Sequence, residues 1–335
     1  MSRFQPPHCP HPRCPSRHGR APFLWRRRGS YPRKVDGRRV QRFLCRTCGR
    51  SFSTQSFRLD YRLQRVHVNP ALFRLLVSKV TFRQAARLLG IDRKTVARRA
   101  RLFGRHARRF HEARLRAARA RGGLDGVFQL DELETFETDR RLQPLTVPVL
   151  IERRSFFVVH VGVGTLPARG GLSAAKKRRK AELERLRGKR RSQSRAQVRV
   201  AVRRLGRVLA AGAPLVFESD RKSTYPGILR EVFGGRVGSH RRVSSRARRC
   251  PGSVLFPINH TLARMRDRVS RLVRRNWGAS KRRRCLRWHL WMWVAWRNYL
   301  RPVTVAAGVP TPGVIVGAAE RRWAVADFLR WRVTL

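Results

Sequence analysis

Acidic residues are scarce in this sequence: 19 Asp and Glu stand against 79 Lys and Arg, which gives a formal net charge of +60 in 335 residues. Charge of that size repels itself and is tolerated mainly when a polyanion is the partner, so a nucleic acid is expected. The competing explanation is a GC-rich genome that enriches arginine codons. Codon bias alone would not remove acids this thoroughly.

Long apolar runs are also missing. The opening "MSRFQPPHCPHPRCPSRHGR" lacks the apolar segment of a secretory signal. The most apolar run late in the chain, "LRWHLWMWVAWRNYL", is too short and too interrupted by Arg and His to span a bilayer. These absences argue against secretion and against a membrane partner, and we expect a cytoplasmic protein. In a reducing compartment the six cysteines should be thiols or metal ligands rather than disulfides.

Four of the cysteines come early and in two pairs, "CPHPRC" and "CRTC", separated by about thirty residues that can form a hairpin. Two thiolate pairs on short loops can form the tetrahedral sulfur site that Zn²⁺ prefers, so residues 1–60 are predicted to be a zinc ribbon. The first pair is spaced more loosely than usual, which leaves His8, His11 or His18 open as a substitute ligand. The predicted zinc ligands are Cys9, Cys14, Cys45 and Cys48.

Residues 61–124 predict a helical DNA-binding domain and a linker. In "TFRQAARLLGIDRKTVARRARLF" one amphipathic helix ends at Gly90 and a second opens with Asp92 or Thr95, which is a helix-turn-helix pattern. Basic side chains on the second helix would face solvent and suit phosphates and base edges. An ordinary helical hairpin with a solvated basic face is the alternative. Residues 112–124 are expected to be the linker. The candidate DNA-binding residues are Arg93, Lys94, Thr95, Arg98 and Arg99.

From residue 125 onward the pattern becomes strand-like. "GVFQLDELETF", "LTVPVLIE" and "SFFVVHVGVGTL" predict three antiparallel strands, and "APLVFESD" predicts a fourth strand after a helix. A fourth strand beside the first is the RNase H-like order. The expected fold class is therefore multidomain α/β, with an RNase H-like mixed β-sheet domain and flanking helices over 125–335. A basic helical insertion around 171–195 is expected to contact DNA backbone without reading sequence.

About a quarter of the acidic residues lie between Asp131 and Asp139. Asp131 on the first strand and Asp220 at the end of the fourth strand should meet at the carboxyl end of the sheet, where two carboxylates repel unless a divalent cation lies between them. Mg²⁺ or Mn²⁺ there could activate water or a 3′-hydroxyl for phosphodiester attack. Glu132 and Glu134 are expected to pair with basic side chains, and Glu218 is a reserve ligand.

The modules occur in a familiar order: "CRTCGRSF", "RQAARLLGIDRKTVARR", "QLDELETF", "FESD" and "INHTLARMRDRVSRLVRR". The chain resembles bacterial insertion-sequence transposases with a zinc ribbon, a helix-turn-helix and a DDE catalytic domain. The resemblance implies that Asp131 and Asp220 are the first two acids of the triad and that His240 in "GSH" orients a phosphate. It also implies double-stranded transposon ends and target DNA as partners, a homo-oligomer on DNA, and a location at the bacterial nucleoid.

The third catalytic position departs from that family. Its members carry Glu near the start of the last catalytic helix, whereas this chain has Asn259 in "PINHT". An amide oxygen can coordinate a metal but brings no charge and cannot act as a base. The alternative role for Asn259 is a helix N-cap after Pro257. Asp267 lies about 12 Å further along the helix axis, too far to substitute.

The departure at Asn259 leaves a second interpretation open: a catalytically inactive, transposase-derived DNA-binding protein or repressor. An RNA-binding protein would fit the charge but not the helix-turn-helix pattern.

Overall fold

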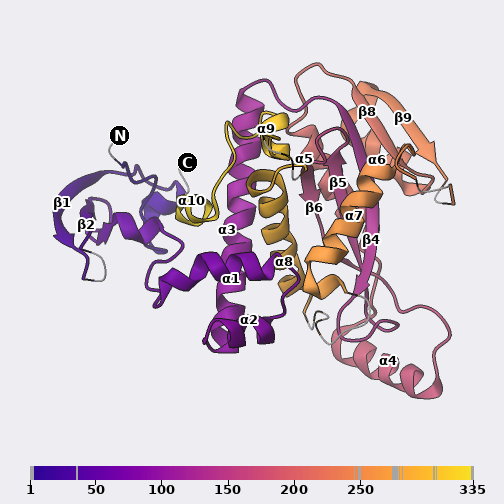
Figure 1. Cartoon of the computed structure of the whole chain (residues 1–335), viewed down its shortest axis with the longest axis horizontal. Helices are drawn as coiled ribbons and strands as arrows, with labels where there is room; N and C mark the ends of the chain where they lie inside the picture. Colours follow the sequence, from indigo (N-terminus) through magenta and orange to yellow (C-terminus); the bar gives the residue numbers. More distant parts are fainter. Residues whose placement is uncertain are drawn as a thin grey trace. The chain divides into compact units, whose positions relative to one another are not determined.

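The chain forms two compact units (Figure 1). The first unit comprises Met1–Asn69 together with Ala326–Leu335, and the second comprises Pro70–Val325. The return of the last ten residues to the first unit has no counterpart in the sequence pattern. No helix in the described part of the chain is long and apolar enough to cross a membrane. The computed structural model describes residues 4–34, 37–244, 246–247, 250–273, 278, 280, 282–304, 306 and 308–332.

The first unit is built on an antiparallel sheet of three strands, in the order β1-β2-β3. Its small core consists of cysteines and aromatic rings, and the Phe43 and Phe52 rings stack with centroids 5.4 Å apart. Gly49, directly after the second cysteine pair, has a φ of +66°, a conformation that glycine adopts without strain. The elements are η1 (Pro15–His18), β1 (Trp25–Pro32), β2 (Arg39–Cys45), β3 (Ser51–Ser53), η2 (Thr54–Phe57), η3 (Val66–Val68) and the terminal α10 (Val325–Arg330).

The second unit begins with three helices, α1 (Asn69–Leu76), α2 (Phe82–Leu88) and α3 (Arg93–Ala120). The tight turn between α2 and α3 lies where the sequence predicts it: Gly90 has a φ of +56°, and the Asp92 carboxylate caps α3 by accepting the Lys94 N–H at 2.6 Å.

The predicted linker at residues 112–124 is wrong, because α3 runs through it to Ala120. Apolar residues at helical spacing keep one face of the helix buried beyond the predicted end, including Leu115 and Ala118.

Helix α3 packs lengthwise against α8 (Arg283–Ala295), as Figure 1 shows. The two backbones come very close at Gly104, where an added Cβ would lie 2.4 Å from the Trp288 Cβ. Further along, the buried His111 ring contacts the Tyr299 hydroxyl at 2.9 Å and the Val159 carbonyl oxygen at 3.0 Å. Burial lowers the pKa of His111 to about 4, so this ring is a neutral core group.

A mixed sheet follows, with the strand order β6-β5-β4-β8-β9 and the short β7 paired to β5. The first three strands pair antiparallel, and β8 lies beside β4 and runs parallel to it, as does β9 beside β8. The predicted placement of the fourth strand beside the first is confirmed. The strands are β4 (Val127–Phe136), β5 (Pro144–Glu152), β6 (Val158–Val161), β7 (Gly164–Thr165), β8 (Leu215–Asp220) and β9 (Val237–Val243).

Helices cover both faces of this sheet. Glu132 of β4 contacts Ser194 of α5, whereas Gln129 of the same strand accepts a hydrogen bond from the Ile258 N–H of α7. Since alternate residues of a strand point to opposite faces, α5 and α7 cover opposite sides. The remaining elements are α4 (Ala174–Arg187), α5 (Ser194–Gly206), α6 (Thr224–Phe233), η4 (Gly234–Arg236), α7 (Phe256–Arg268), η5 (Ser270–Leu272), the π-helical turn Trp296–Leu300 and α9 (Pro312–Ile315).

We predict that Gly104→Ala lowers the free energy of unfolding by about 1–3 kcal/mol, because the added methyl group collides with the Trp288 backbone. The matched control is Gly227→Ala in α6, where nothing lies within 4 Å of the added Cβ. This control should leave stability unchanged or raise it by up to about 1 kcal/mol through helix propensity. Urea-unfolding midpoints measure both, and a Gly104→Ala midpoint at or above the wild-type value contradicts the packing described.

Candidate zinc site and candidate active site

The four early cysteines converge in the first unit, as predicted from their spacing. The Cys9 and Cys48 sulfurs lie 3.7 Å apart, the Cys14 and Cys45 sulfurs 3.8 Å apart, and all four within 4.8 Å of one another. A tetrahedral zinc ion with Zn–S bonds of about 2.3 Å requires sulfur–sulfur distances of about 3.8 Å. A disulfide would require about 2.05 Å. The cluster is therefore consistent with zinc binding.

The neighbouring histidines are not needed as ligands. The His11 ring contacts the Ser51 carbonyl oxygen at 3.3 Å and the His18 ring contacts the Pro12 carbonyl oxygen at 2.7 Å. Within the described ranges, the cysteine cluster is the one group of three or more His, Cys, Asp or Glu residues close enough to share an ion.

Hydrogen bonding prepares one cysteine of the cluster for metal binding. Burial opposes ionisation of Cys14, but hydrogen bonds from the Ser16 hydroxyl, 3.0 Å away, and from the Ser16 N–H outweigh it and lower the pKa of Cys14 to about 6. Burial raises the pKa of Cys9 and Cys48. Since the thiolate is the form that binds metal, the hydrogen bonds from Ser16 favour the metal-binding form of Cys14.

The carboxylates of Asp131 and Asp220 come from neighbouring parallel strands. Leu130 of β4 lies opposite Ser219 of β8, so the next residues, Asp131 and Asp220, follow in the same register on strands about 4.8 Å apart. Two residues earlier, the Gln129 amide donates to the Glu218 carboxylate at 2.6 Å. Because Gln129 also contacts α7, strand alternation puts Asp131 and Asp220 on the α7 face.

Asn259 lies on α7 beside a hollow of about 660 Å³ that Asp131 also lines. Asp220 is half-buried and is not among the lining residues of this hollow. The N-cap alternative for Asn259 is wrong: Leu255 occupies the cap, and Asn259 is the fourth residue of the helix. Within the described chain, the Asn259 side chain has no hydrogen-bond partner, which leaves its amide available to a ligand in the hollow.

A set of three residues, called here the clamp, fixes both aspartates: Glu132, Ser194 and Lys222. The Glu132 N–H donates to Asp131 Oδ1 at 2.6 Å, and the Lys222 N–H donates to Asp220 Oδ1 at 3.2 Å. The side chains of Glu132 and Lys222 form an ion pair, and the Ser194 hydroxyl contacts each of them at 2.8 Å. Glu132 is thus a partner of a basic side chain, as expected, and each end of the ion pair supports one aspartate.

Tyr225 is close enough to three carboxylates to be affected by their charge. The pKa of its phenol is raised by burial and further by the charges of Glu132, Asp220 and Asp131. The phenol therefore stays neutral beside the acids. No sequence motif predicts that Lys222, Ser194 and Tyr225 belong to this site. The one signal in the sequence is that Lys222 follows Asp220 by two residues.

Glu218 is engaged by protein groups. It is 4 % exposed, accepts the Gln129 amide and forms an ion pair with Arg153 at 3.1 Å. These contacts account for its charge without a metal ion.

His240 does not lie with the aspartates. It pairs with Phe217 across β8 and β9, and its ring contacts the Ser219 hydroxyl at 2.8 Å. Phe217 and Ser219 alternate with Glu218 and Asp220 along β8, so His240 is on the face opposite Asp131. Burial and the nearby Arg242 lower the pKa of His240. A direct role for His240 at the aspartates has no geometric support.

Four of the five candidate DNA-binding residues reach solvent at least in part. Arg93, Lys94 and Arg98 are exposed and Thr95 is half-buried. The expectation that Arg99 faces solvent is wrong, since only 4 % of it is exposed. Position 99 shares the inner face of α3 with Val96 and Phe103. The expectation followed from the charge of Arg99 and did not consider its position around the helix axis.

We predict about one zinc ion per wild-type chain and almost none in Cys45→Ser, because three thiolates hold zinc far less tightly than four. Cys285→Ser is the matched control, since Cys285 lies outside the cluster, and it should retain full occupancy. Elemental analysis of the purified proteins gives the metal content. Equal zinc in the two variants would refute this ligand set.

We also predict that Lys222→Met costs about 2–3 kcal/mol of unfolding free energy, since it leaves the largely buried Glu132 carboxylate unpaired. The cost is below that of a fully buried pair because the Lys222 side chain is 33 % exposed. The double variant Glu132→Gln/Lys222→Met should recover most of the loss. As a control, Arg169→Met removes an exposed ion pair with Glu134 and should cost no more than about 1 kcal/mol. Additive losses in the double variant would rule out the clamp.

Comparison with known proteins gives little. No known protein family matches this chain, and no curated protein matches it. The crystal structure of the catalytic domain of Mos1 mariner transposase is similar over 68 % of this chain and 94 % of that chain, with 11 % identity and a TM-score of 0.24. The Mos1 mariner paired end complex with Mn is similar over 54 % of this chain and 61 % of that chain, with 13 % identity and a TM-score of 0.20. Likenesses this weak carry no functional argument, which therefore depends on the residues of this chain.

Proposed function

We propose that this chain is a DDE-type DNA transposase of the bacterial insertion-sequence kind, with an RNase H-like catalytic domain. It binds the ends of its element, cuts a strand and transfers the freed 3′-hydroxyl to target DNA. The observation that supports this best is the adjacent register of Asp131 and Asp220 on the first and fourth strands, on the face covered by α7. Paired carboxylates at that position, in a chain of charge +60, suit phosphodiester chemistry on a polyanion.

Mg²⁺ or Mn²⁺ fits the donor set of this site. Asp131 and Asp220 would supply carboxylate oxygens and Asn259 an amide oxygen, the hard ligands that Mg²⁺ prefers. When bound, the ion activates the attacking water or hydroxyl and stabilises the leaving oxygen. The clamp holds the two carboxylates in place by backbone N–H donation.

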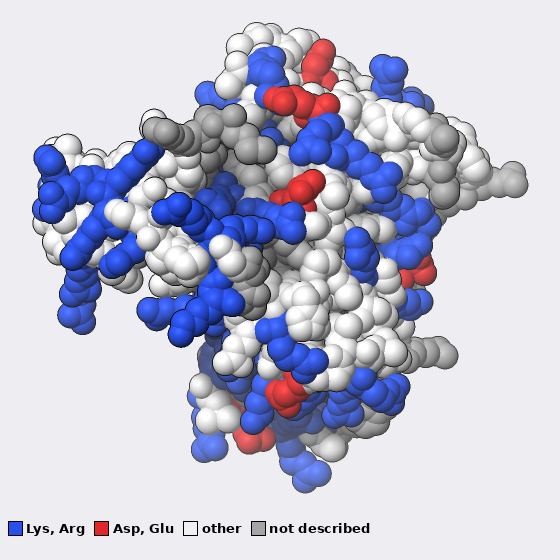
Figure 2. All heavy atoms as spheres, turned by 60° about the vertical axis from the view of Figure 1, so that its left-hand side comes forward, with Lys and Arg blue, Asp and Glu red and all other residues white. Residues whose placement is uncertain are grey.

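Recognition of DNA is assigned to the cysteine cluster with its zinc and to the start of α3. Arg93, Lys94, Thr95 and Arg98 remain candidates for contact with the transposon ends. Figure 2 shows a face on which Lys and Arg side chains are abundant and Asp and Glu form a few isolated spots, as suits a duplex DNA partner. Assembly of two or more copies on paired ends, and a location at the bacterial nucleoid in the cytoplasm, belong to the same proposal.

A specific observation favours a second candidate, an inactive transposase-derived DNA-binding protein or repressor. Helix α7 brings no carboxylate to the hollow: its one acid, Asp267, pairs with Arg268 and lies 3.9 Å from Lys79. The neutral Asn259 holds a divalent ion less strongly than a glutamate would, because it adds no charge.

Strand joining tests the two candidates. Purified protein is given Mg²⁺ or Mn²⁺ and a labelled duplex that carries the end of its own element. Wild type is expected to cut and join, whereas Asp131→Asn and Asp220→Asn reduce the rate by more than about 100-fold because they weaken metal binding. Asn259→Ala should reduce activity as well. Glu231→Gln is the matched control, since Glu231 of α6 pairs with Arg199 and Arg203 and is not among the residues that line the hollow, and it should stay active.

The opposite outcome is equally clear. If wild type binds the end tightly but never cuts it, and Asn259→Glu does not restore cutting, the transposase proposal fails and the DNA-binding candidate stands.

A further inference from the structure

Helix α4 and the segment after it form an unusually basic projection, called here the arm (residues 174–191). It carries ten Lys and Arg and two Glu. In Figure 1, α4 projects beyond the end of β4, and none of its side chains is buried. A helix without a buried face gains little stability from packing, so the role of α4 is expected to lie in its exposed basic surface.

The acids at the end of β4 anchor the arm and the segment before it. Glu137 pairs with Arg190 at 3.0 Å, Asp139 pairs with Lys176 at 3.4 Å, and Glu134 pairs with Arg169. The Arg190 guanidinium also donates to the carbonyl oxygens of Leu166 and Pro144, each at 3.0 Å. The arm is therefore fixed at both ends to the β4–β5 turn, although it lacks a core of its own.

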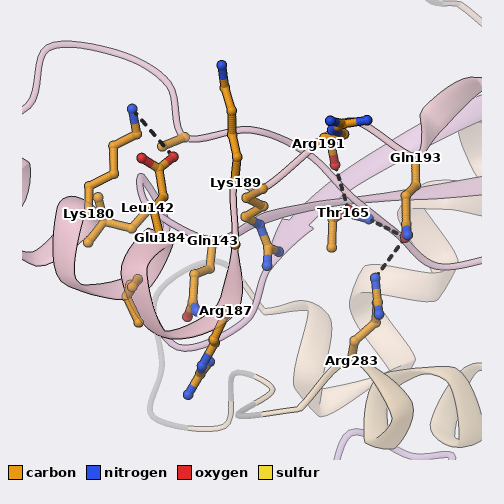
Figure 3. Close-up of a pocket in the computed structure, with 14 residues that line it drawn as sticks. Leu142, Gln143, Thr165, Lys180, Glu184, Arg187, Lys189, Arg191, Gln193 and Arg283 are labelled. Atoms are coloured by element: carbon orange, nitrogen blue, oxygen red, sulfur yellow. Dashed lines mark hydrogen bonds and ion pairs between the residues drawn. The ribbon is translucent and has the colours of Figure 1, made fainter.

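Beneath the arm is a cavity of about 320 Å³ between α4, the end of β7 and the start of α8 (Figure 3). Its one acid, Glu184, lies 3.7 Å from Lys180, and Arg283 donates to Gln193 at 2.7 Å. Three further lining cations have no partner among the described residues: Arg187, Lys189 and Arg191. Figure 3 shows the Arg187 and Lys189 side chains extending in opposite directions. Cations spread in this way suit successive phosphates of a long polyanion better than one small anion.

We propose that the arm is a separate binding site for the backbone of duplex DNA, with Arg187, Lys189 and Arg191 contacting phosphates. The identification of the polyanion as DNA rests on the proposed function. Phe136, at the end of β4, lies five positions after Asp131, which is about 17 Å of strand. That distance puts the arm beyond the reach of any ligand set around Asp131, so it binds DNA independently of the aspartates.

The test is the salt dependence of binding to a random-sequence duplex, measured by fluorescence anisotropy in EDTA. The variant is Arg187→Ala/Lys189→Ala/Arg191→Ala. The slope of log K against log salt should fall by about 0.9 for each phosphate that the variant no longer neutralises, or about 2.7 in all. The matched control is Arg116→Ala/Arg119→Ala/Arg207→Ala, which removes three exposed cations near the C-terminal end of α3 and directly after α5. It should change the slope much less. Replacement of Arg187 and Arg191 by Lys should preserve the slope, because backbone contacts need charge and not the guanidinium.

Equal slope changes in the arm and control variants would overturn the proposal, since they would show only an effect of total charge. So would a structured RNA that competes better than duplex DNA at matched salt, with that preference abolished in the arm variant. Because binding in EDTA involves no cutting, an inactive aspartate site leaves this result unchanged, and a failed arm prediction leaves the strand-joining test open.

Discussion

Electrostatic neutralisation is the constraint on which this structure depends, because there are about four Lys or Arg for each Asp or Glu. The acids between Asp131 and Asp139 divide into two roles. Asp131 lies beside the hollow under α7. The others neutralise cations that would otherwise drive neighbouring segments apart: Glu132 holds Lys222, and the three beyond it hold the approach to the arm and the arm itself. The local concentration of acid thus has a structural reason as well as a chemical one.

Strand β4 serves both roles because its side chains alternate. Its odd-numbered residues Gln129 and Asp131 face α7, and Glu132 faces α5 and the end of β8. One strand can therefore hold a carboxylate for chemistry on one side and an ion pair that fixes its position on the other. Adjacent residues do not compete for the same cation, because the sheet separates them.

Local pattern was enough to predict much of this architecture. The cysteine spacing predicted the sulfur cluster, and the strand-like runs predicted which strand pairs with Asp131's strand. The predictions that were wrong concern the direction in which a side chain points, which depends on how its helix or strand packs against a segment distant in sequence. Arg99 is buried because its position falls on the inner face of α3 with Val96 and Phe103, and His240 faces away because the register with β8 sets its direction. The continuation of α3 to Ala120 and the return of the C-terminus to the first unit also follow from contacts that no local window contains.

The length of α3 has a mechanical consequence. Twenty-eight unbroken residues make a rod of about 42 Å. Its first turn carries exposed cations, while its middle is pressed against α8 at Gly104 and tied to β6 through His111 and the Val159 carbonyl oxygen. A rod seated in this way has no hinge between its ends. Because α3 is one continuous helix between its exposed first turn and its contact with β6, its length sets the separation between these two points.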